Sequence, residues 1–442
     1  MRSDTTTLDL ESIFRLDDRV SIIQDGVPLT RTVIGRNAVR LRESLSAYPA
    51  CRVALTSQRA DQIVVALVAC QSRGCDLLLL REHYSYDDPV WQSWGISVVL
   101  NDSLSVEHTF PGARGTAGDC GPRVLLTTSG TTGKPKIAIH SLSALLGRIA
   151  NMKSESARWL LTFHPASFAG LQVLLTALTS ESELVGTSAP TLANLAELFQ
   201  KYQPTHVSGT PTFWRGVLLV LGNRNRNILL KQITIGGEAV DQDTIDMLRD
   251  VFPAARITHI YASTEAGALF AVKDGHAGFP AQWLDHDIEG VSLRIRKGVL
   301  EVRSPRTMEN YLTDSITKVR TEDGWIITGD LVENIGDRVV FKGRIDDVIN
   351  VGGAKVSPEE VEAILLKMPL VKEVRVFGQR NPLSGAVVTA EVVVPSGTDE
   401  DYARQAIYSF AKLHLENFKV PRILKFVPEI STNSSGKKSR QR

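Results

Sequence analysis

The chain has 442 residues, of which 43% are hydrophobic and 22% are charged, and its formal net charge is +1. A single hydrophobic core stops growing beyond roughly 250–300 residues, so we expect at least two domains. The near-neutral charge gives no general electrostatic reason to bind nucleic acid or an anionic membrane. No apolar run approaches the roughly 20 residues of a membrane-spanning helix, and the start of the chain lacks the order of a signal peptide. We therefore predict a cytoplasmic protein without a nucleic-acid or membrane partner.

Strand and helix patterns alternate through much of the chain. Residues 52–55 and the apolar run 77–80 have the pattern of strands, and a helical pattern separates them. The same alternation returns over 190–209, 229–240 and 256–264. Strands separated by helices of this length indicate parallel sheets with helices packed on their faces.

The pattern changes twice toward the C-terminus. From about residue 290, short alternating strands separated by glycines predict a small β-barrel-like section. After Asp346 the pattern becomes that of a small α+β unit. Its first helix is marked by a hydroxyl N-cap at Ser357, a proline at Pro358 and a capping-box carboxylate at Glu360.

Together these patterns predict an α/β fold with two domains. The first is a large N-terminal body, residues 1–345, of mixed, largely parallel sheets flanked by helices, which includes the barrel-like section. The second is a small α+β C-terminal domain, residues 346–442.

The segment Val124–Lys136, VLLTTSGTTGKPK, passes from an apolar run into small and hydroxylated residues accompanied by two lysines. Consecutive small residues let backbone N–H groups converge on an anion, and hydroxyls add further donors, so the segment predicts a phosphate site. A flexible solvated turn is the alternative. The segment is not a Walker A loop, which would need glycine at Thr128 and serine or threonine at Pro135.

Four further segments accompany this loop: YASTEAG at 261–267, GWIITGDL at 324–331, FKGRIDDVINVGGAKVSPEEVE at 341–362 and NSSGKKSR at 433–440. In this order, the five segments resemble the motifs of the AMP-forming acyl-adenylating enzymes. This superfamily contains the acyl-CoA synthetases, the nonribosomal peptide adenylation domains and firefly luciferase. The chain most resembles its acid–CoA ligases.

The resemblance implies a two-step reaction. A carboxylate attacks the α-phosphate of ATP, giving an acyl-adenylate and pyrophosphate, and a thiol then displaces AMP to give a thioester. Phosphoryl chemistry of this kind needs mostly positioning and charge neutralisation. The implied cofactors are ATP, Mg²⁺ and CoA, or the phosphopantetheine of a carrier protein in place of CoA.

The resemblance also implies a role for each matching residue. The expected catalytic residues are Lys437, which bridges the substrate carboxylate and the nucleotide, Thr264 on the α-phosphate, Glu265 as the Mg²⁺ ligand, and His164. The residues expected to bind the nucleotide are Thr128, Ser129, Gly130, Thr131, Thr132, Gly133, Lys134, Lys136, Gly236, Gly237, Glu238, Tyr261, Ala262, Ser263, Asp330 and Arg344.

Within this set, residues 128–136 would hold the β- and γ-phosphates and 236–238 would lie along the adenine. Asp330 would accept hydrogen bonds from both ribose hydroxyls. Taken singly, Asp330 could be a turn residue, Glu265 a solvated carboxylate at a helix start, and Lys437 part of a frayed basic tail. Only the joint order of the motifs favours the functional roles.

The pair Phe163–His164 bears on the substrate. Amino-acid-activating members of the superfamily carry an aspartate after the phenylalanine, which binds the α-ammonium group, so its absence here disfavours an α-amino acid. His164 would lie near the acyl and pantetheine channel, or would be a core-packed histidine. The other candidates for the acyl pocket, with Phe163, are Phe168, Ser208, Gly209 and Gly267. We expect an aryl or apolar acyl group.

The second step implies that the small domain is mobile. In this superfamily it rotates about a hinge, and Asp346 occupies the hinge position. Gly352 and Gly353 would then approach the thiol tunnel, since glycine lets the backbone come close to a ligand. A simple turn is the equal alternative. The segment before the phosphate loop is short for the superfamily, which implies a trimmed N-terminal subdomain.

Three functions remain open from the sequence. The first is an acid–CoA ligase. The second is a stand-alone enzyme that loads an acyl or aryl carrier protein. The third is a nucleotide-binding protein without catalysis, which the joint presence of Glu265, Asp330, Arg344 and Lys437 argues against. The sequence does not distinguish a monomer from a homodimer.

Overall fold

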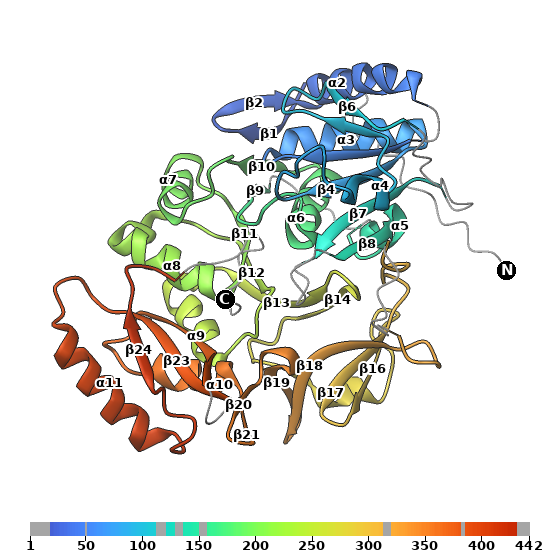
Figure 1. The fold of residues 1–442 in the computed structure, drawn as a ribbon. Coiled ribbons are helices and arrows are strands. Elements are labelled where there is room, and N and C mark those ends of the chain that lie inside the picture. Colours follow the sequence, from blue (N-terminus) through green and yellow to red (C-terminus); the bar gives the residue numbers. More distant parts are fainter. Residues whose placement is uncertain are drawn as a thin grey trace.

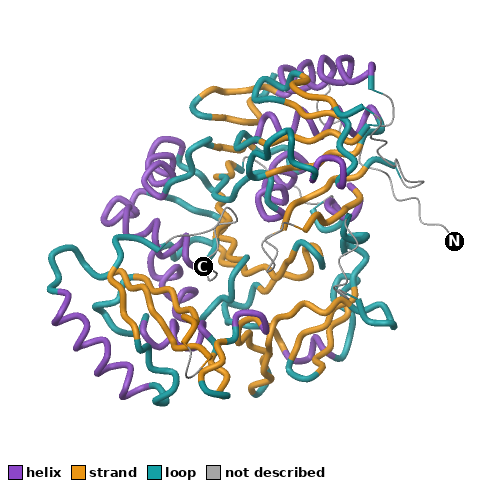
Figure 2. The backbone as a smooth tube through the Cα atoms, viewed as in Figure 1, coloured by secondary structure: helices purple, strands orange, loops and turns teal. Residues whose placement is uncertain are grey.

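The computed structural model describes residues 18–48, 51–111, 121–128, 136–149, 157–312, 320–381 and 385–430. Two largely parallel sheets form the body, and an antiparallel sheet and a small α+β unit lie below them in Figure 1. No helix in these ranges is long and apolar enough to cross a membrane. Figure 2 shows that strands run through the centre of each layer and that helices cover the outside of the body and of the small unit.

The first body sheet has eight strands. In spatial order they are β14 (Gly267–Val272), β13 (Arg256–Ser263), β12 (Gln232–Gly236), β11 (His206–Gly209), β9 (Arg158–Leu160), β10 (Glu183–Gly186), β1 (Val20–Gln24) and β2 (Val27–Thr30). The strands from β13 to β1 are parallel, and the edge strands β14 and β2 are antiparallel to their neighbours.

The second body sheet has six strands. They are β6 (Val106–Thr109), β5 (Val98–Leu100), β3 (Arg52–Thr56), β4 (Asp76–Leu80), β7 (Arg123–Thr128) and β8 (Lys136–Ser141). The four inner strands are parallel. β4 is buried along its whole length, as its continuous apolar run predicts.

Helices pack between the sheets and on the far face of the first sheet. Those of the body are α2 (Arg31–Ser44), α3 (Ala60–Arg73), α4 (Val90–Ser93), α5 (Leu142–Leu146), α6 (Phe168–Thr179), α7 (Leu192–Tyr202), α8 (Pro211–Leu221) and α9 (Gln242–Val251). One core cluster joins α2, α3 and α6 to both sheets. A second cluster packs α7, α8 and α9 against Val207, Ile233 and Ile235. The opposite face of β11 and β12 is therefore the one turned toward α6.

The antiparallel sheet contains the short strands expected beyond residue 290. Its order is β15 (Phe279–Pro280), β19 (Arg338–Arg344), β18 (Ile326–Ile335), β17 (Val299–Arg303) and β16 (Ser292–Arg296). Its core includes Phe270 of β14, which packs against Phe279 and Trp283. The sheet is thus fixed to the edge of the first body sheet.

The C-terminal unit has its own core. Its strands are β20 (Ile349–Val351), β21 (Ala354–Val356), β22 (Glu373–Asn381), β23 (Gly385–Val393) and β24 (Ile423–Phe426), and its helices are α10 (Pro358–Leu365) and α11 (Glu400–His414). The one-turn 3₁₀ segment Ile345–Asp347 connects it to β19. A direct ion pair also joins it to the body, because Nε of Arg215 on α8 lies 3.0 Å from Oε2 of Glu373.

The start of α10 agrees in part with the predicted capping box. Ser357 is the N-cap, its hydroxyl accepts the N–H of Glu360, and Pro358 is the first helical residue. The Glu360 carboxylate, however, lies 2.7 Å from Nζ of Lys419. The Glu360 side chain thus pairs with Lys419, which is distant in the sequence, whereas the local pattern predicted that it would cap the helix.

Candidate active site

Two cavities adjoin at the carboxyl ends of β12 and β13. The larger, of about 840 Å³, lies between the body, the antiparallel sheet and α10. The smaller, of about 520 Å³, lies between the first body sheet and α6. Both are lined by Gly237, Ile260, Ala262 and Ser263. Ligands of α/β proteins bind at such strand ends, so the pair of cavities is the candidate site.

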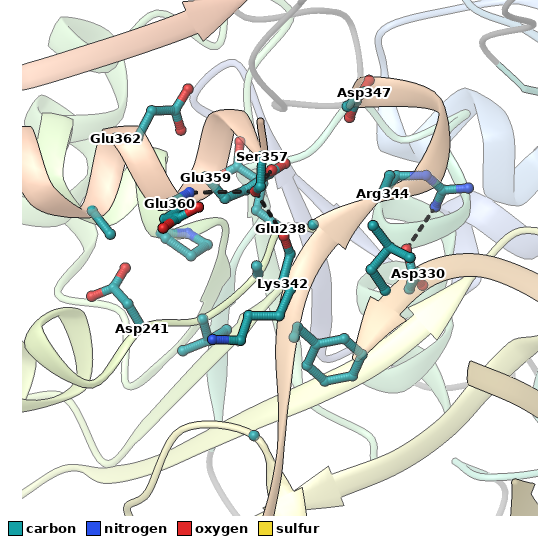
Figure 3. Close-up of a pocket in the computed structure, with 18 of the residues that line it drawn as sticks. Glu238, Asp241, Asp330, Lys342, Arg344, Asp347, Ser357, Glu359, Glu360 and Glu362 are labelled. Atoms are coloured by element: carbon teal, nitrogen blue, oxygen red, sulfur yellow. Dashed lines mark hydrogen bonds and ion pairs between the residues drawn. The ribbon is translucent and has the colours of Figure 1, made fainter. Parts of the chain in front are cut away.

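The larger cavity contains an interacting group centred on Asp330 (Figure 3). One Asp330 oxygen accepts the hydroxyl of Tyr261. The other lies 3.1 Å from Nη1 of Arg344, the pair that Figure 3 marks with a dashed line. The Tyr261 ring stacks on Phe341 with 4.9 Å between ring centroids. Burial, followed by the charge of Asp330, raises the pKa of Tyr261 well above its usual range, so the hydroxyl stays a donor. The carboxylate is therefore oriented from two sides at the cavity wall.

The segment 236–238 follows β12 and lies where the two cavities meet. Gly237 has φ of +83°, a left-handed conformation that glycine adopts without strain. Oε2 of Glu238 accepts the backbone N–H and the hydroxyl of Thr212, at 3.1 and 2.8 Å. These bonds tie the segment to the first turn of α8. Gly237 and Glu238 line the larger cavity and Gly236 lines the smaller.

Residues from three parts of the chain meet at the end of the β7–β8 hairpin. Thr128 and Lys136 are cross-strand partners there. Nζ of Lys136 lies 5.5 Å from the centroid of the Tyr311 ring, and the Tyr311 hydroxyl donates to Oε1 of Glu265 at 2.7 Å. Burial, followed by the charge of Glu265, raises the pKa of Tyr311. The expected Mg²⁺ ligand thus lies beside the base of the expected phosphate loop.

These residues fit a nucleotide with its magnesium ion. Carboxylate and phosphate oxygens are the ligands that Mg²⁺ prefers, and Glu265 offers a carboxylate next to the hairpin. Within the described ranges, no group of three or more His, Cys, Asp or Glu side chains forms a metal site without a nucleotide. The loop residues Ser129, Gly130, Thr131, Thr132, Gly133 and Lys134 lie outside the described residues.

His164 does not line either cavity. Its Nδ1 accepts the N–H of Ala166 at 3.1 Å, so a neutral ring carries its proton on Nε2, which has no partner among the described residues. Burial, followed by the charge of Arg81, lowers the pKa of His164 to about 4. Arg81 in turn donates to the Thr127 hydroxyl at 3.4 Å. His164 is therefore a neutral imidazole with an N–H donor, close to the β7–β8 hairpin.

The smaller cavity contains part of the expected acyl pocket. Phe163, Phe168 and Ser208 line it, as does Thr264. Gly209 and Gly267 do not. A Cβ on Gly209 would lie 2.2 Å from the ring of Phe213, and one on Gly267 would lie 2.2 Å from the carbonyl oxygen of Arg306. These two glycines permit close packing beside the cavity.

The expected hinge and tunnel residues lie at the edge of the site. Asp346 is exposed in the 3₁₀ segment between β19 and β20. Gly352 and Gly353 are exposed at the β20–β21 turn, and nothing lies within 4 Å of a Cβ built on either. They line neither cavity in this arrangement of the domains. Lys437 lies outside the described residues.

Sequence reasoning missed several residues of the site. Tyr311, which contacts Glu265, belongs to no motif, and Thr212, which holds Glu238, is marked only by the helix start after Thr210. Arg256 and Lys273, at the ends of strands, line the smaller cavity outside every motif. Only the pairing of distant strands brings these side chains to the site.

Two adjoining cavities, the larger one bordered by a separate α+β unit, are the arrangement expected of an enzyme that brings two substrates together. The family model described as AMP-binding enzyme matches residues 117–312, and the one described as AMP-binding enzyme C-terminal domain matches 360–437. Together they cover more than half of the chain. The chain belongs to the AMP-binding enzyme family.

Three relatives illustrate the similarity. A 2-succinylbenzoate–CoA ligase of Bacillus velezensis is 26% identical over an alignment of 444 positions, which covers 92% of this chain and 90% of the relative. A 4-chlorobenzoate–CoA ligase of Arthrobacter sp. is 28% identical over an alignment of 355 positions, which covers 72% of this chain and 65% of the relative. The o-succinylbenzoate CoA synthetase of Bacillus subtilis, solved with its acyl-adenylate intermediate, has a TM-score of 0.74 and 20% identity over 97% of this chain and 96% of that one.

The same Bacillus subtilis enzyme has also been solved with ATP and magnesium, with a TM-score of 0.73, 20% identity and 97% coverage of both chains. The predicted family and fold class are thereby confirmed, and with them the prediction of an enzyme of the acid–thiol ligase class. The roles of individual residues stay predictions.

Proposed function

We propose that the chain is an acid–CoA ligase, which activates a carboxylic acid without an α-amino group as its acyl-adenylate and then transfers the acyl group to CoA. The observation that carries the proposal is the junction of the two cavities. The Tyr261–Asp330–Arg344 group lines one cavity, and Thr264 lines the other. Gly237, Ile260, Ala262 and Ser263 line both. A nucleotide and an acid bound in these cavities would meet at Thr264.

The described residues suggest how each reacting group would be held. Asp330 and Arg344 would fix the ribose, and Thr264 would donate to the α-phosphate. Glu265 would hold Mg²⁺, which supplies charge neutralisation to the phosphates when it is bound. A carboxylate oxygen then attacks the α-phosphorus and the bond to pyrophosphate breaks. Lys437 would offset the negative charge that accumulates as the two anions meet.

The second step would need a different arrangement of the domains. We propose that residues 346–442 rotate as a unit about Asp346, because one short 3₁₀ turn is the covalent connection. Rotation would have to break the Arg215–Glu373 ion pair. It would bring a new face of the small domain, which we propose contains Gly352 and Gly353, toward the thiol tunnel.

The names of the relatives support CoA as the acceptor and an aromatic acid as the substrate, since both curated relatives are CoA ligases of benzoates. A carrier-protein phosphopantetheine is the alternative acceptor, and we retain it as an outcome of the test. Cytoplasmic location stays a prediction.

The test is ATP–pyrophosphate exchange with a panel of aromatic and aliphatic acids. Lys437→Ala is the informative variant, and the neighbouring Lys438→Ala is its matched control. The proposal predicts exchange that depends on the acid, is lost in Lys437→Ala and is retained in Lys438→Ala. Exchange that is equal in both variants would remove Lys437 from the mechanism, and exchange with none of the acids would contradict the ligase proposal.

A further inference from the structure

The floor of the smaller cavity is one face of the first body sheet, and that face is polar. Cross-strand pairing aligns Trp159, His206, Gln232 and Arg256 in one row across β9, β11, β12 and β13. All four line the cavity. The next row, toward the nucleotide, contains Ser208, Thr234 and Thr258, and these also line it.

This polarity differs from what packing alone requires. A parallel sheet between two layers of helices normally carries apolar residues on both faces. Here the face toward α7, α8 and α9 follows that rule with Val207, Ile233 and Ile235. The face toward α6 carries hydroxyl, amide, imidazole and guanidinium groups instead. Polar groups placed at a cavity floor indicate a polar ligand group.

The outer row supplies hydrogen-bond donors without enough acceptors. Trp159 is 6% exposed, and its indole N–H has no acceptor among the described residues. Buried donors of folded proteins nearly always have a partner. Nε of Arg256 donates to Oε1 of Gln232 at 2.6 Å, and within the described ranges this guanidinium makes no ion pair. The Trp159 N–H and the Arg256 guanidinium can therefore each bind an acceptor on a ligand in this cavity.

The charges around the outer row are positive in sum. The cavity is lined by three cations, Arg148, Arg256 and Lys273, and by one carboxylate, Glu289. Glu289 is already 2.9 Å from Nη1 of Arg148. Burial, followed by the charges of Arg256 and Lys231, lowers the pKa of His206 to about 4, so this ring is neutral. Of the three cations that line this cavity, Arg256 and Lys273 form no ion pair with a carboxylate of the described residues.

We infer that the acid activated by this enzyme carries a second anionic group at its far end, bound by Arg256 and Lys273. The inference rests on the proposed function and specifies its substrate. Gly236, beside the nucleotide cavity, and Gln232 in the outer row are four positions apart on β12, which corresponds to about 13 Å along the strand. The second anion would therefore lie about that far from the reacting carboxylate, with an aryl or aliphatic body between them.

The alternative is that Arg256 and Lys273, both exposed, are solvated surface cations that happen to border the cavity. This alternative predicts no preference for an anionic far end. The two explanations therefore differ in a measurable selectivity.

The probes are the α,ω-dicarboxylates from hexanedioate to dodecanedioate, each with its monomethyl ester. Pyrophosphate release and calorimetric binding are both measured for the full chain and for Arg256→Met and Lys273→Met. Arg40→Met, an exposed arginine on α2 outside both cavities, is the matched control. The monoesters serve as an internal control for folding, because a merely damaged sheet would weaken both members of each pair.

We expect at least one dicarboxylate to be preferred over its monoester by about tenfold, as for a partly exposed charge-assisted contact. Arg256→Met and Lys273→Met should reduce this preference, and Arg40→Met should not. Equal use of diacids and monoesters, or binding of neither, would overturn the inference. Pyrophosphate release with monoesters alone would do so while leaving the proposed function intact. Preferential binding of a diacid without pyrophosphate release would support anion binding by Arg256 and Lys273 and refute the proposed function.

Discussion

Replacement of Asp330 by asparagine tests the nucleotide end of the site. The side chain is 14% exposed, accepts the Tyr261 hydroxyl and pairs with Arg344, whose own side chain is 47% exposed. Asparagine keeps the shape and one acceptor oxygen, so Tyr261 retains a partner. It loses the negative charge and one of the two oxygens proposed to accept ribose hydroxyls.

The size of the expected effect on ATP binding follows from these contacts. The exposed pairing with Arg344 is worth about 0–1 kcal/mol, whereas a hydrogen bond to a charged group contributes about 1.5–3 kcal/mol. Asp330→Asn should therefore raise the KM for ATP by about tenfold to a hundredfold and leave the KM for the acid nearly unchanged.

The assay is pyrophosphate exchange at varied ATP, with calorimetry for ATP binding. Asp323→Asn is the control, because Asp323 lies near the same antiparallel sheet and pairs with Arg294 at 2.7 Å but lines neither cavity. An ATP KM that is the same in Asp330→Asn, Asp323→Asn and the parent would refute the ribose role.

Four further changes have defined outcomes. Glu265→Gln should raise the Mg²⁺ concentration for half-maximal activity by about tenfold, since a charged ligand is lost; an unchanged magnesium titration would speak against a metal role. Lys437→Ala should slow adenylate formation by about 10²–10³-fold, yet still convert synthetic acyl-adenylate to thioester; equal loss of both steps would argue that the residue is structural. Arg215→Met should remove the ion pair between α8 and Glu373, which is 8% exposed, and so increase protease cleavage near residue 346. Unchanged cleavage would show that the pair does not hold the domains. His140 is fully buried, and burial lowers its pKa to about 4, below its value in the unfolded chain. The free energy of unfolding of the parent should therefore fall by about 2–3 kcal/mol as the pH falls from about 6.5 to 4, and that of His140→Phe should fall by less. Identical pH profiles of urea unfolding for the two proteins would contradict this prediction.

The layered body could be predicted because its signals are local. The apolar run at 77–80 is the buried strand β4, and the hydroxyl of Thr191 caps α7 just after Pro190. Such patterns depend on neighbours in the sequence, which fix period and capping. The order of the strands in each sheet did not follow from them, because it is set by the packing of distant segments.

The site was predictable where a motif carries it. Asp330 and Tyr261, identified from separate motifs, share a hydrogen bond across 69 positions. Tyr311 and the outer row from Trp159 to Arg256 were missed, because no short pattern marks a residue whose contact arises from strand register alone. No motif includes Arg256, the first residue of β13, or Lys273, the residue after β14.

The most direct test of the account is a single-turnover reaction followed by mass spectrometry, first with acid, ATP and Mg²⁺ and then after addition of CoA. The account predicts an acyl-adenylate that accumulates before CoA is added and that afterwards disappears as acyl-CoA and AMP form together. If the adenylate persists after CoA is added but is consumed by a phosphopantetheinylated carrier protein, the carrier protein and not CoA is the acceptor. ATP that binds but never yields an adenylate with any acid would contradict the central claim.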